Sequence, residues 1–342
     1  MKNWSLPKLL LFSVGAGLAL MAVFALVANF VFANNGTDLI NPTDEPSPTL
    51  TREGETGKIT VVTSTRVWAE ITELLANEWV EVVSLVPNGQ DPHSYQASAR
   101  DQLSISEADL VIANGGGYDD FMDQLVLAAD VDQVFLKLVE GEEVHLGEES
   151  HDEGEAHEHS DNEHIWYDFD LTLDAAELIV QVIAELRPEA FESVNAGFDF
   201  FTTEMANLEI RLEALRERGL GLGFIAPESV ANLMMVNAGF EDLTPSGLAT
   251  AIEEDREVSV ADLAQAESLL SNRVAELLII NVSSTPDSVT DRLIAAAEAG
   301  GREIVRVSET GFIDRGDGSP IEELSYLDWM AWVLDQLQDA IY

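Results

Sequence analysis

Cysteine is absent from the 342 residues of this chain, and histidine occurs only six times. The absence of cysteine excludes disulfides, thiolate metal ligands and a cysteine-linked lipid anchor. About 285 residues follow the N-terminal segments described below, which is enough to bury a core without disulfides.

Basic residues are also scarce, with 17 Lys and Arg against 63 Asp and Glu and a formal net charge of -46. A surface this negative repels nucleic acid and anionic lipid, and it raises the local concentration of cations. Solubility in a salty or acidic habitat is the simplest explanation of the acidity, so charge alone identifies no ligand. Because of this repulsion, we expect no nucleic-acid partner.

Charged residues are missing from residues 9–33, an apolar run that follows Lys2 and Lys8. Residues 1–33 are therefore a signal peptide or a membrane anchor, because the run is long enough to span a bilayer and Val31-Phe32-Ala33 is an acceptable cleavage site. The lysines before the run put the rest of the chain outside the cytoplasm. We expect an extracytoplasmic protein, in the periplasm or at the cell surface, secreted or tethered by the N-terminal helix.

Residues 34–57 are rich in Asn, Thr, Pro, Glu and Gly and are predicted to be a flexible linker. Beyond them, short β-branched runs alternate with helical periodicity, which predicts a parallel α/β sheet. These runs are residues 58–63, 80–86, 110–113 and 134–138 in the first half and residues 222–226, 277–280 and 304–307 in the second half.

Residues 189–218 show helical spacing without an internal proline, over a length of about 45 Å. The predicted fold is therefore α/β, with two similar lobes that contain parallel sheets and are joined by one long rigid helix. We place the N-terminal lobe at residues 58–187, the linking helix at 188–220 and the C-terminal lobe at 221–342. Ligands of such sheets bind in a cleft at the carboxyl ends of the strands.

Two histidines follow predicted strands. His93 ends a Pro-x-Gly-x-Asp-Pro-His turn after residues 80–86, and His164 begins the sequence His-Ile-Trp-Tyr-Asp. Neutral imidazole is the commonest protein ligand of transition metals, so both are candidate ligands in the interlobe cleft. Asp168 is the candidate outer acceptor that orients His164. The alternative for each histidine is a hydrogen bond to a backbone carbonyl.

The other four histidines lie in an acidic loop at residues 141–163, which is too polar to pack in a core. The loop is either a solvated charge run or an accessory site of weak metal capture. Its histidines are His145, His151, His157 and His159.

Residues 86–125 resemble the first signature of the cluster A-I substrate-binding proteins, the zinc and manganese receptors of ABC importers. The matching residues are Gly89, Asp91, Pro92, His93, Tyr95, Asp101, Ala108 to Val111, and Asn114-Gly115. The sequence NEHIWYDF is similar to the second signature, Asp-Pro-His-x-Trp-x-Asp-Pro, with Asn162-Glu163 in place of Asp-Pro. The similarity extends from Lys58 to the C-terminal residues.

The resemblance implies two further ligands, Glu228 and Glu309. Glu228 stands where most zinc members have histidine and manganese members have glutamate, and Glu309 matches an acid after the last strand. The implied set of His93, His164, Glu228 and Glu309 suits Zn²⁺ in tetrahedral geometry and also suits Mn²⁺. The carboxylate pair favours manganese and the histidine loop favours zinc, so both remain open.

The resemblance implies a monomeric receptor that captures the ion as transported ligand, hands it to an ABC permease and is not an enzyme. One alternative is a metal-dependent hydrolase, since two histidines and a carboxylate can hold a catalytic metal. The sequence contains no His-Glu-x-x-His, no nucleophile elbow and no phosphate loop. The other alternative is a surface adhesin, for which a tether and acidity would suffice.

Overall fold

The computed structural model describes residues 57–90, 92–129, 131, 133–139, 162–253, 256–283, 287–316 and 318–341. The predicted signal or anchor, nearly all of the linker, Asp91 and the four loop histidines lie outside these residues. Contacts divide the chain between Glu55 and Thr56, and both lobes belong to the unit Thr56–Tyr342. Within the described ranges, no helix is both long and apolar enough to cross a membrane.

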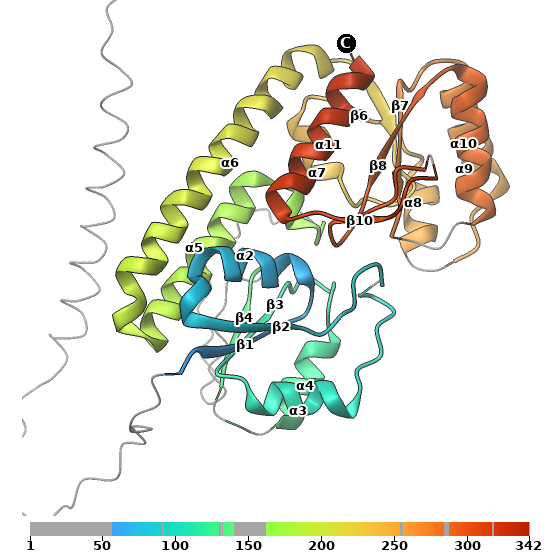
Figure 1. Cartoon of the computed structure of the whole chain (residues 1–342). Coiled ribbons are helices and arrows are strands. Elements are labelled where there is room, and N and C mark those ends of the chain that lie inside the picture. Colours follow the sequence, from blue (N-terminus) through green and yellow to red (C-terminus); the bar gives the residue numbers. More distant parts are fainter. Residues whose placement is uncertain are drawn as a thin grey trace, which may run out of the picture. The chain divides into compact units, whose positions relative to one another are not determined.

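The N-terminal lobe contains a parallel sheet with strand order β2-β1-β3-β4 (Figure 1). β3 is buried along its whole length, as expected of a central parallel strand covered on both faces. In chain order the elements are β1 (Ile59–Thr63), α2 (Arg66–Ala76), the 3₁₀ turn η1 (Asn77–Trp79), β2 (Val80–Ser84), α3 (Ala99–Glu107), β3 (Leu110–Ala113), α4 (Phe121–Ala129) and β4 (Val134–Lys137).

Two long helices follow this sheet. The 3₁₀ turn η2 (Ile165–Tyr167) leads into α5 (Phe169–Leu186), and the 3₁₀ turn η3 (Pro188–Ala190) precedes α6 (Phe191–Gly219). The 29 residues of α6 give it a length of about 43 Å. It is the predicted linking helix, except that Pro188 starts a separate 3₁₀ turn before it.

The C-terminal lobe contains a second parallel sheet with strand order β6-β5-β7-β8, and β9 and β10 form a small antiparallel pair. This order matches that of the first sheet, so the predicted fold of two similar parallel α/β lobes is confirmed. In chain order its elements are β5 (Gly223–Ile225), α7 (Asn232–Asn237), β6 (Glu241–Asp242), α8 (Ser246–Glu253), α9 (Val260–Ser271), β7 (Leu277–Asn281), α10 (Ser288–Gly300), β8 (Glu303–Val307), β9 (Phe312–Ile313), β10 (Glu322–Glu323) and α11 (Tyr326–Ile341).

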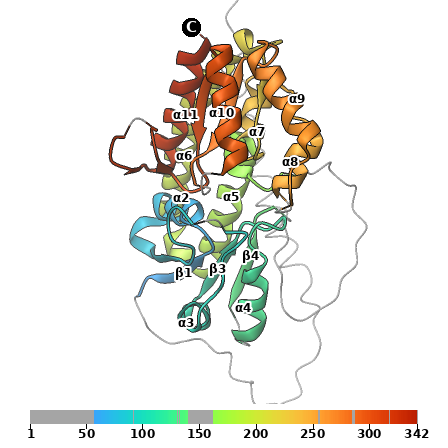
Figure 2. The same ribbon diagram turned by 90° about the vertical axis from the view of Figure 1, so that its right-hand side faces the viewer.

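The largest apolar cluster contains residues of both lobes, among them Trp68 and Trp166 of the first and Phe224 and Trp329 of the second. Helix α11 contributes to it by packing on α6 and α2 (Figure 2). Helices α10 and α11 both pack on β8. The lobes therefore share one core, which fixes the strand ends of both sheets relative to each other.

Candidate metal centre

Polar side chains follow the strands at the carboxyl edge of each sheet. In the first sheet β1 lies between β2 and β3, and in the second β5 lies between β6 and β7, so the strand order reverses at these points. Ligands of open α/β sheets bind at such reversals. Asn114 follows β3, Asn281 ends β7, and Glu228 and Glu309 follow β5 and β8.

The two predicted histidine ligands lie close together. Their ring centroids are 6.4 Å apart, and the buried ring of Tyr118 packs edge-on against both, at 5.0 Å from His93 and 5.6 Å from His164. His164 is buried and His93 is exposed. The two histidines therefore pack against the same side chain, that of Tyr118.

Asn162 determines the orientation of His164. Its Oδ1 accepts the backbone N–H of His164 at 2.9 Å and lies 3.0 Å from the ring Nδ1. An acceptor at this position places the ring proton on Nδ1 and leaves the Nε2 lone pair for a ligand. His164 Nε2 is buried and has no hydrogen-bond partner in the described part of the chain. A metal ion fits this buried nitrogen, which is otherwise costly to leave unpaired.

Burial, together with the nearby His93, lowers the pKa of His164 to about 3. The imidazole is therefore neutral at physiological pH, which is the form that binds metal.

The contacts of Asp168 differ from those predicted. Its Oδ1 accepts the backbone N–H groups of Asp170 and Leu171 and so caps α5, and its Oδ2 accepts from Asn237 at 2.9 Å. Asn162, rather than Asp168, makes the contact to His164 that the sequence led us to expect of Asp168.

The side chain of Glu163 lies close to both histidines. One ligand atom from each of His93, Glu163 and His164 lies within 4.8 Å of the other two. Glu163 Oε1 is 3.5 Å from His93 Nε2 and 3.9 Å from His164 Nδ1. Burial raises the pKa of Glu163. Glu163 was not among the predicted ligands because it replaces a proline of the signature, although its position beside His164 was a usable signal.

The two predicted glutamates are linked by one amide. Asn281 Nδ2 donates to Glu228 Oε2 at 2.7 Å and to Glu309 Oε1 at 2.8 Å. Asn281 Oδ1 accepts the backbone N–H of Ser283 at 2.9 Å, which fixes the direction of the amide. Glu309 is only 4% exposed. Sequence reasoning missed Asn281 because a single asparagine at the end of an apolar strand carries no distinctive signal.

Two contacts connect the histidine side to the glutamate side. Tyr118 donates its hydroxyl to Glu309 Oε2 at 3.1 Å, and Asn162 Nδ2 donates to the carbonyl of Ser229 at 2.8 Å. The structure thus brings the histidines together, brings the glutamates together and joins the two pairs. Glu228 and Glu309 lie outside the tight group formed by His93, Glu163 and His164.

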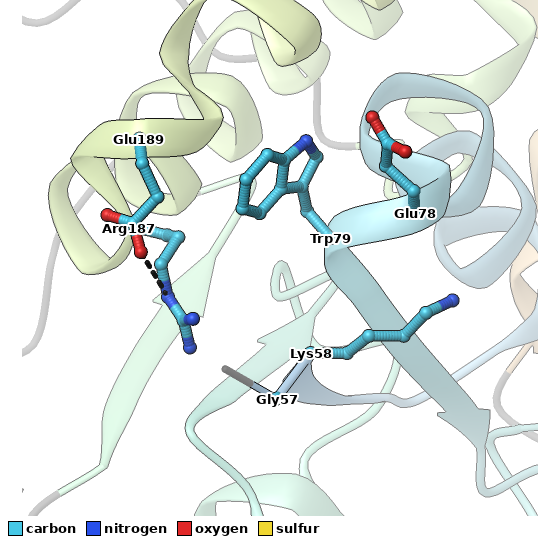
Figure 3. A pocket seen from close by; sticks show the side chains of 6 residues that line it. All are labelled: Gly57, Lys58, Glu78, Trp79, Arg187 and Glu189. Atoms are coloured by element: carbon cyan, nitrogen blue, oxygen red, sulfur yellow. Dashed lines mark ion pairs between the residues drawn. The ribbon is translucent and has the colours of Figure 1, made fainter. Parts of the chain in front are cut away.

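An open pocket at the start of β1 shares no residue with this site. Figure 3 shows its lining, in which the indole of Trp79 lies near the ion pair between Arg187 Nε and Glu189 Oε1 at 3.7 Å. The remaining lining residues are Gly57, Lys58 and Glu78. The pocket contains no histidine, so it is not the metal centre.

Comparison with known proteins gives a consistent result. The model of a family described as "Zinc-uptake complex component A periplasmic" matches residues 61–340. The zinc-binding lipoprotein AdcA of Streptococcus pneumoniae is 24% identical over 226 residues, which cover 64% of this chain and 44% of AdcA. The manganese ABC transporter substrate-binding lipoprotein PsaA of the same species is 43% identical over 58 residues, which cover 17% of this chain and 19% of PsaA. The chain thus spans less than half the length of either relative.

A solved structure shows the same fold. The periplasmic zinc-binding protein TroA of Treponema pallidum matches with a TM-score of 0.64 and 21% identity, over 83% of this chain and 99% of TroA.

Proposed function

This chain belongs to the family of periplasmic component A proteins of zinc-uptake complexes, and we propose on that premise that it captures a divalent transition metal. The ion is zinc or manganese, it is bound outside the cytoplasm, and it is delivered to an ABC importer in the membrane. Members of this family are substrate-binding transport proteins rather than enzymes. We propose that this chain likewise acts as a monomer and without catalysis.

The proposed ligands are His93 and His164 from the N-terminal lobe and Glu228 and Glu309 from the C-terminal lobe. The observation that carries the proposal is the buried Nε2 of His164, which lacks a hydrogen-bond partner among the described residues while its Nδ1 is held by Asn162. A neutral imidazole oriented in this way is typical of a metal ligand. The carboxylates on the opposite side supply the charge that balances a divalent cation.

The donor set explains why two metals remain candidates. Imidazole suits zinc, and carboxylate oxygen suits the harder manganese ion. The amide of Asn281 holds one oxygen of each glutamate, which fixes the direction of both carboxylates.

Titration of the metal-stripped protein with Zn²⁺ and Mn²⁺ tests the proposal. We expect one tight ion per chain and no hydrolytic activity. His93→Ala and His164→Ala should each lower affinity by more than about 100-fold, because each removes a bond from a preorganised site. His145→Ala is the control and should have little effect on the tight site. Wild-type affinity in both single variants would exclude these histidines as ligands.

A further inference from the structure

Glu163 is held in place by the core of the N-terminal lobe. Its carbonyl accepts Asn114 Nδ2 at 2.9 Å and the backbone N–H of Ile165 at 2.8 Å. Asn114 is fully buried at the end of β3, and its Oδ1 accepts the indole N–H of Trp68 at 3.1 Å. These contacts leave the backbone of Glu163 little freedom, so the position of its side chain is set by the lobe.

The Glu163 carboxylate faces the histidines from this anchored backbone. Its Oε1 is 3.5 Å from His93 Nε2, and the side chain of Glu163 is only 20% exposed. A largely desolvated carboxylate is unfavourable without a cationic partner. A divalent ion between Glu163 and His93 would provide that partner.

All three members of this group belong to one lobe. His93 follows β2, and Glu163 and His164 precede η2, whereas Glu228 and Glu309 follow strands of the other sheet and are tied to Asn281. The N-terminal lobe therefore offers two nitrogens and one carboxylate by itself. Two histidines and a carboxylate form a set that binds divalent transition metals.

We propose that Glu163 is a metal ligand and that His93, Glu163 and His164 form a half-site, which holds the ion without help from the C-terminal lobe. The inference rests on the proposed function, because it requires the ion to bind His93 and His164. Glu228 and Glu309 then complete the site from the other side. Glu163 also raises the number of ligands to five, above the four of a tetrahedral zinc site, and so adds more to manganese affinity than to zinc affinity.

Glu163→Gln tests the ligand role, since it retains the size of the side chain and removes its charge. We expect Mn²⁺ affinity to fall by about 100-fold and Zn²⁺ affinity to fall less. Glu253→Gln is the matched control, because the exposed Glu253 acts on Glu163 by charge but does not belong to the group. The control should lose less than about fivefold, as expected for removal of an exposed charge. Equal losses in the two variants would overturn the ligand role.

The double variant Glu228→Gln/Glu309→Gln tests the half-site, with Co²⁺ as the probe. We expect it to bind one Co²⁺ per chain with reduced affinity, and we expect the added Glu163→Gln change to abolish binding. The intensity of the Co²⁺ d–d absorption reports the coordination geometry, which a purely structural role of Glu163 would not alter. Complete loss of Co²⁺ binding in the double variant would overturn the half-site.

Failure of the proposed function looks different. A wild-type protein that binds neither Zn²⁺ nor Mn²⁺ would refute both proposals, whereas normal wild-type binding with an unaffected Glu163→Gln variant refutes only the half-site. Circular dichroism checks that each variant folds. Glu163→Ala provides a second variant with the same expected direction if the glutamine variant does not fold.

Discussion

At the residue scale, three asparagine side chains hold the candidate ligands. Asn162 contacts the ring Nδ1 of His164, Asn114 holds the carbonyl of Glu163, and Asn281 bridges Glu228 and Glu309. Because an amide both donates and accepts without carrying charge, it can orient a ligand without competing for the cation. The site is thus preorganised by neutral groups inside a very acidic protein.

Asn281→Ala should lower metal affinity by about 10- to 100-fold, as expected for loss of a residue that orients metal ligands. The two carboxylates would lose their shared donor and repel each other without it. Competition titration against a chelator measures the change. Asn272→Ala is the control, since its exposed amide donates to Ser268 Oγ at 3.0 Å at the end of α9. An Asn281 variant as tight as the control would show that the bridge does not matter.

His164 should make the metal-free protein less stable in acid. Its pKa is about 3 in the folded protein, whereas an exposed histidine in the unfolded chain titrates near about 6.5. Between these values the unfolded chain binds more protons, so the free energy of unfolding rises with pH and falls on acidification. The contribution of this residue approaches about 1.4 kcal/mol per pH unit in the middle of that window.

Denaturant unfolding of the metal-free protein at several pH values between about 4 and 7 measures this slope. His164→Gln is the comparison, because it keeps the carboxylates that also titrate in acid. We expect the wild-type slope to exceed the variant slope within this window. Parallel curves would mean that folding does not lower the pKa of His164.

At the element scale, one residue bonds to described residues on both sides of the acidic histidine segment. The backbone N–H of Val139 donates to the Asn114 carbonyl at 2.8 Å, and the Asn114 side chain donates to the Glu163 carbonyl at 2.9 Å. A segment whose ends are already held together can be shortened at little cost in closure entropy. Asn114 therefore holds Val139 and Glu163 together independently of the length of the segment between them.

Deletion of residues 141–160 should leave one tight metal site with affinity within about threefold of the wild type, because closure of the loop depends on Asn114. Only weaker additional sites should disappear. Calorimetric titration distinguishes the two classes of site. A full-length variant with His145, His151, His157 and His159 changed to Asn separates the effect of the imidazoles from that of length. Loss of the tight site in either variant would mean that the loop provides a principal ligand.

The elements that could be predicted are those whose buried residues form an apolar pattern in the sequence. The runs predicted at residues 110–113 and 277–280 lie in the central strands β3 and β7, and the apolar spacing of residues 189–218 corresponds to α6. Strand β6 was not predicted, because it consists of two exposed acids, Glu241 and Asp242, and forms only through pairing with β5. Pairing between distant segments has no local signature.

The residues of the candidate site also fall into those that the sequence predicts and those that it does not. His93 and His164 were predicted from rare residue types in distinctive turns, and Glu228 and Glu309 came from the family resemblance. Glu163 and Asn281 depend on how two strand ends meet in space, which no local pattern contains. For Asp168, its spacing from His164 suggested an outer acceptor, but its position before α5 makes it a helix cap.

At the scale of the whole folded unit, the shared core limits independent motion of the lobes. Tyr167 donates its hydroxyl to the carbonyl of Ser308, and Tyr326 donates to the carbonyl of Trp166, both at 2.8 Å. Burial raises the pKa of Tyr167 well above its usual value, so the hydroxyl remains a donor. We therefore expect metal entry and release to involve local movements near the exposed His93 more than wide separation of the lobes.

This shared core should produce a single thermal transition despite the two lobes. Differential scanning calorimetry should give equal calorimetric and van't Hoff enthalpies. Tyr167→Phe should lower the free energy of unfolding by about 1 to 3 kcal/mol, because it leaves the buried Ser308 carbonyl without this donor. The transition of this variant should remain single. Two separate transitions in the wild type would show that the lobes unfold independently.

The packing of Trp166 against His164, with ring centroids 5.2 Å apart, gives the molecule an optical signal. An ion on His164 would lie beside a buried indole whose emission responds to its surroundings. Zn²⁺ has a filled d shell, whereas Mn²⁺ has unpaired electrons that provide a quenching route. The fluorescence of Trp166 should therefore be retained when Zn²⁺ binds and quenched when Mn²⁺ binds. Steady-state fluorescence should then both report metal binding and distinguish the two ions.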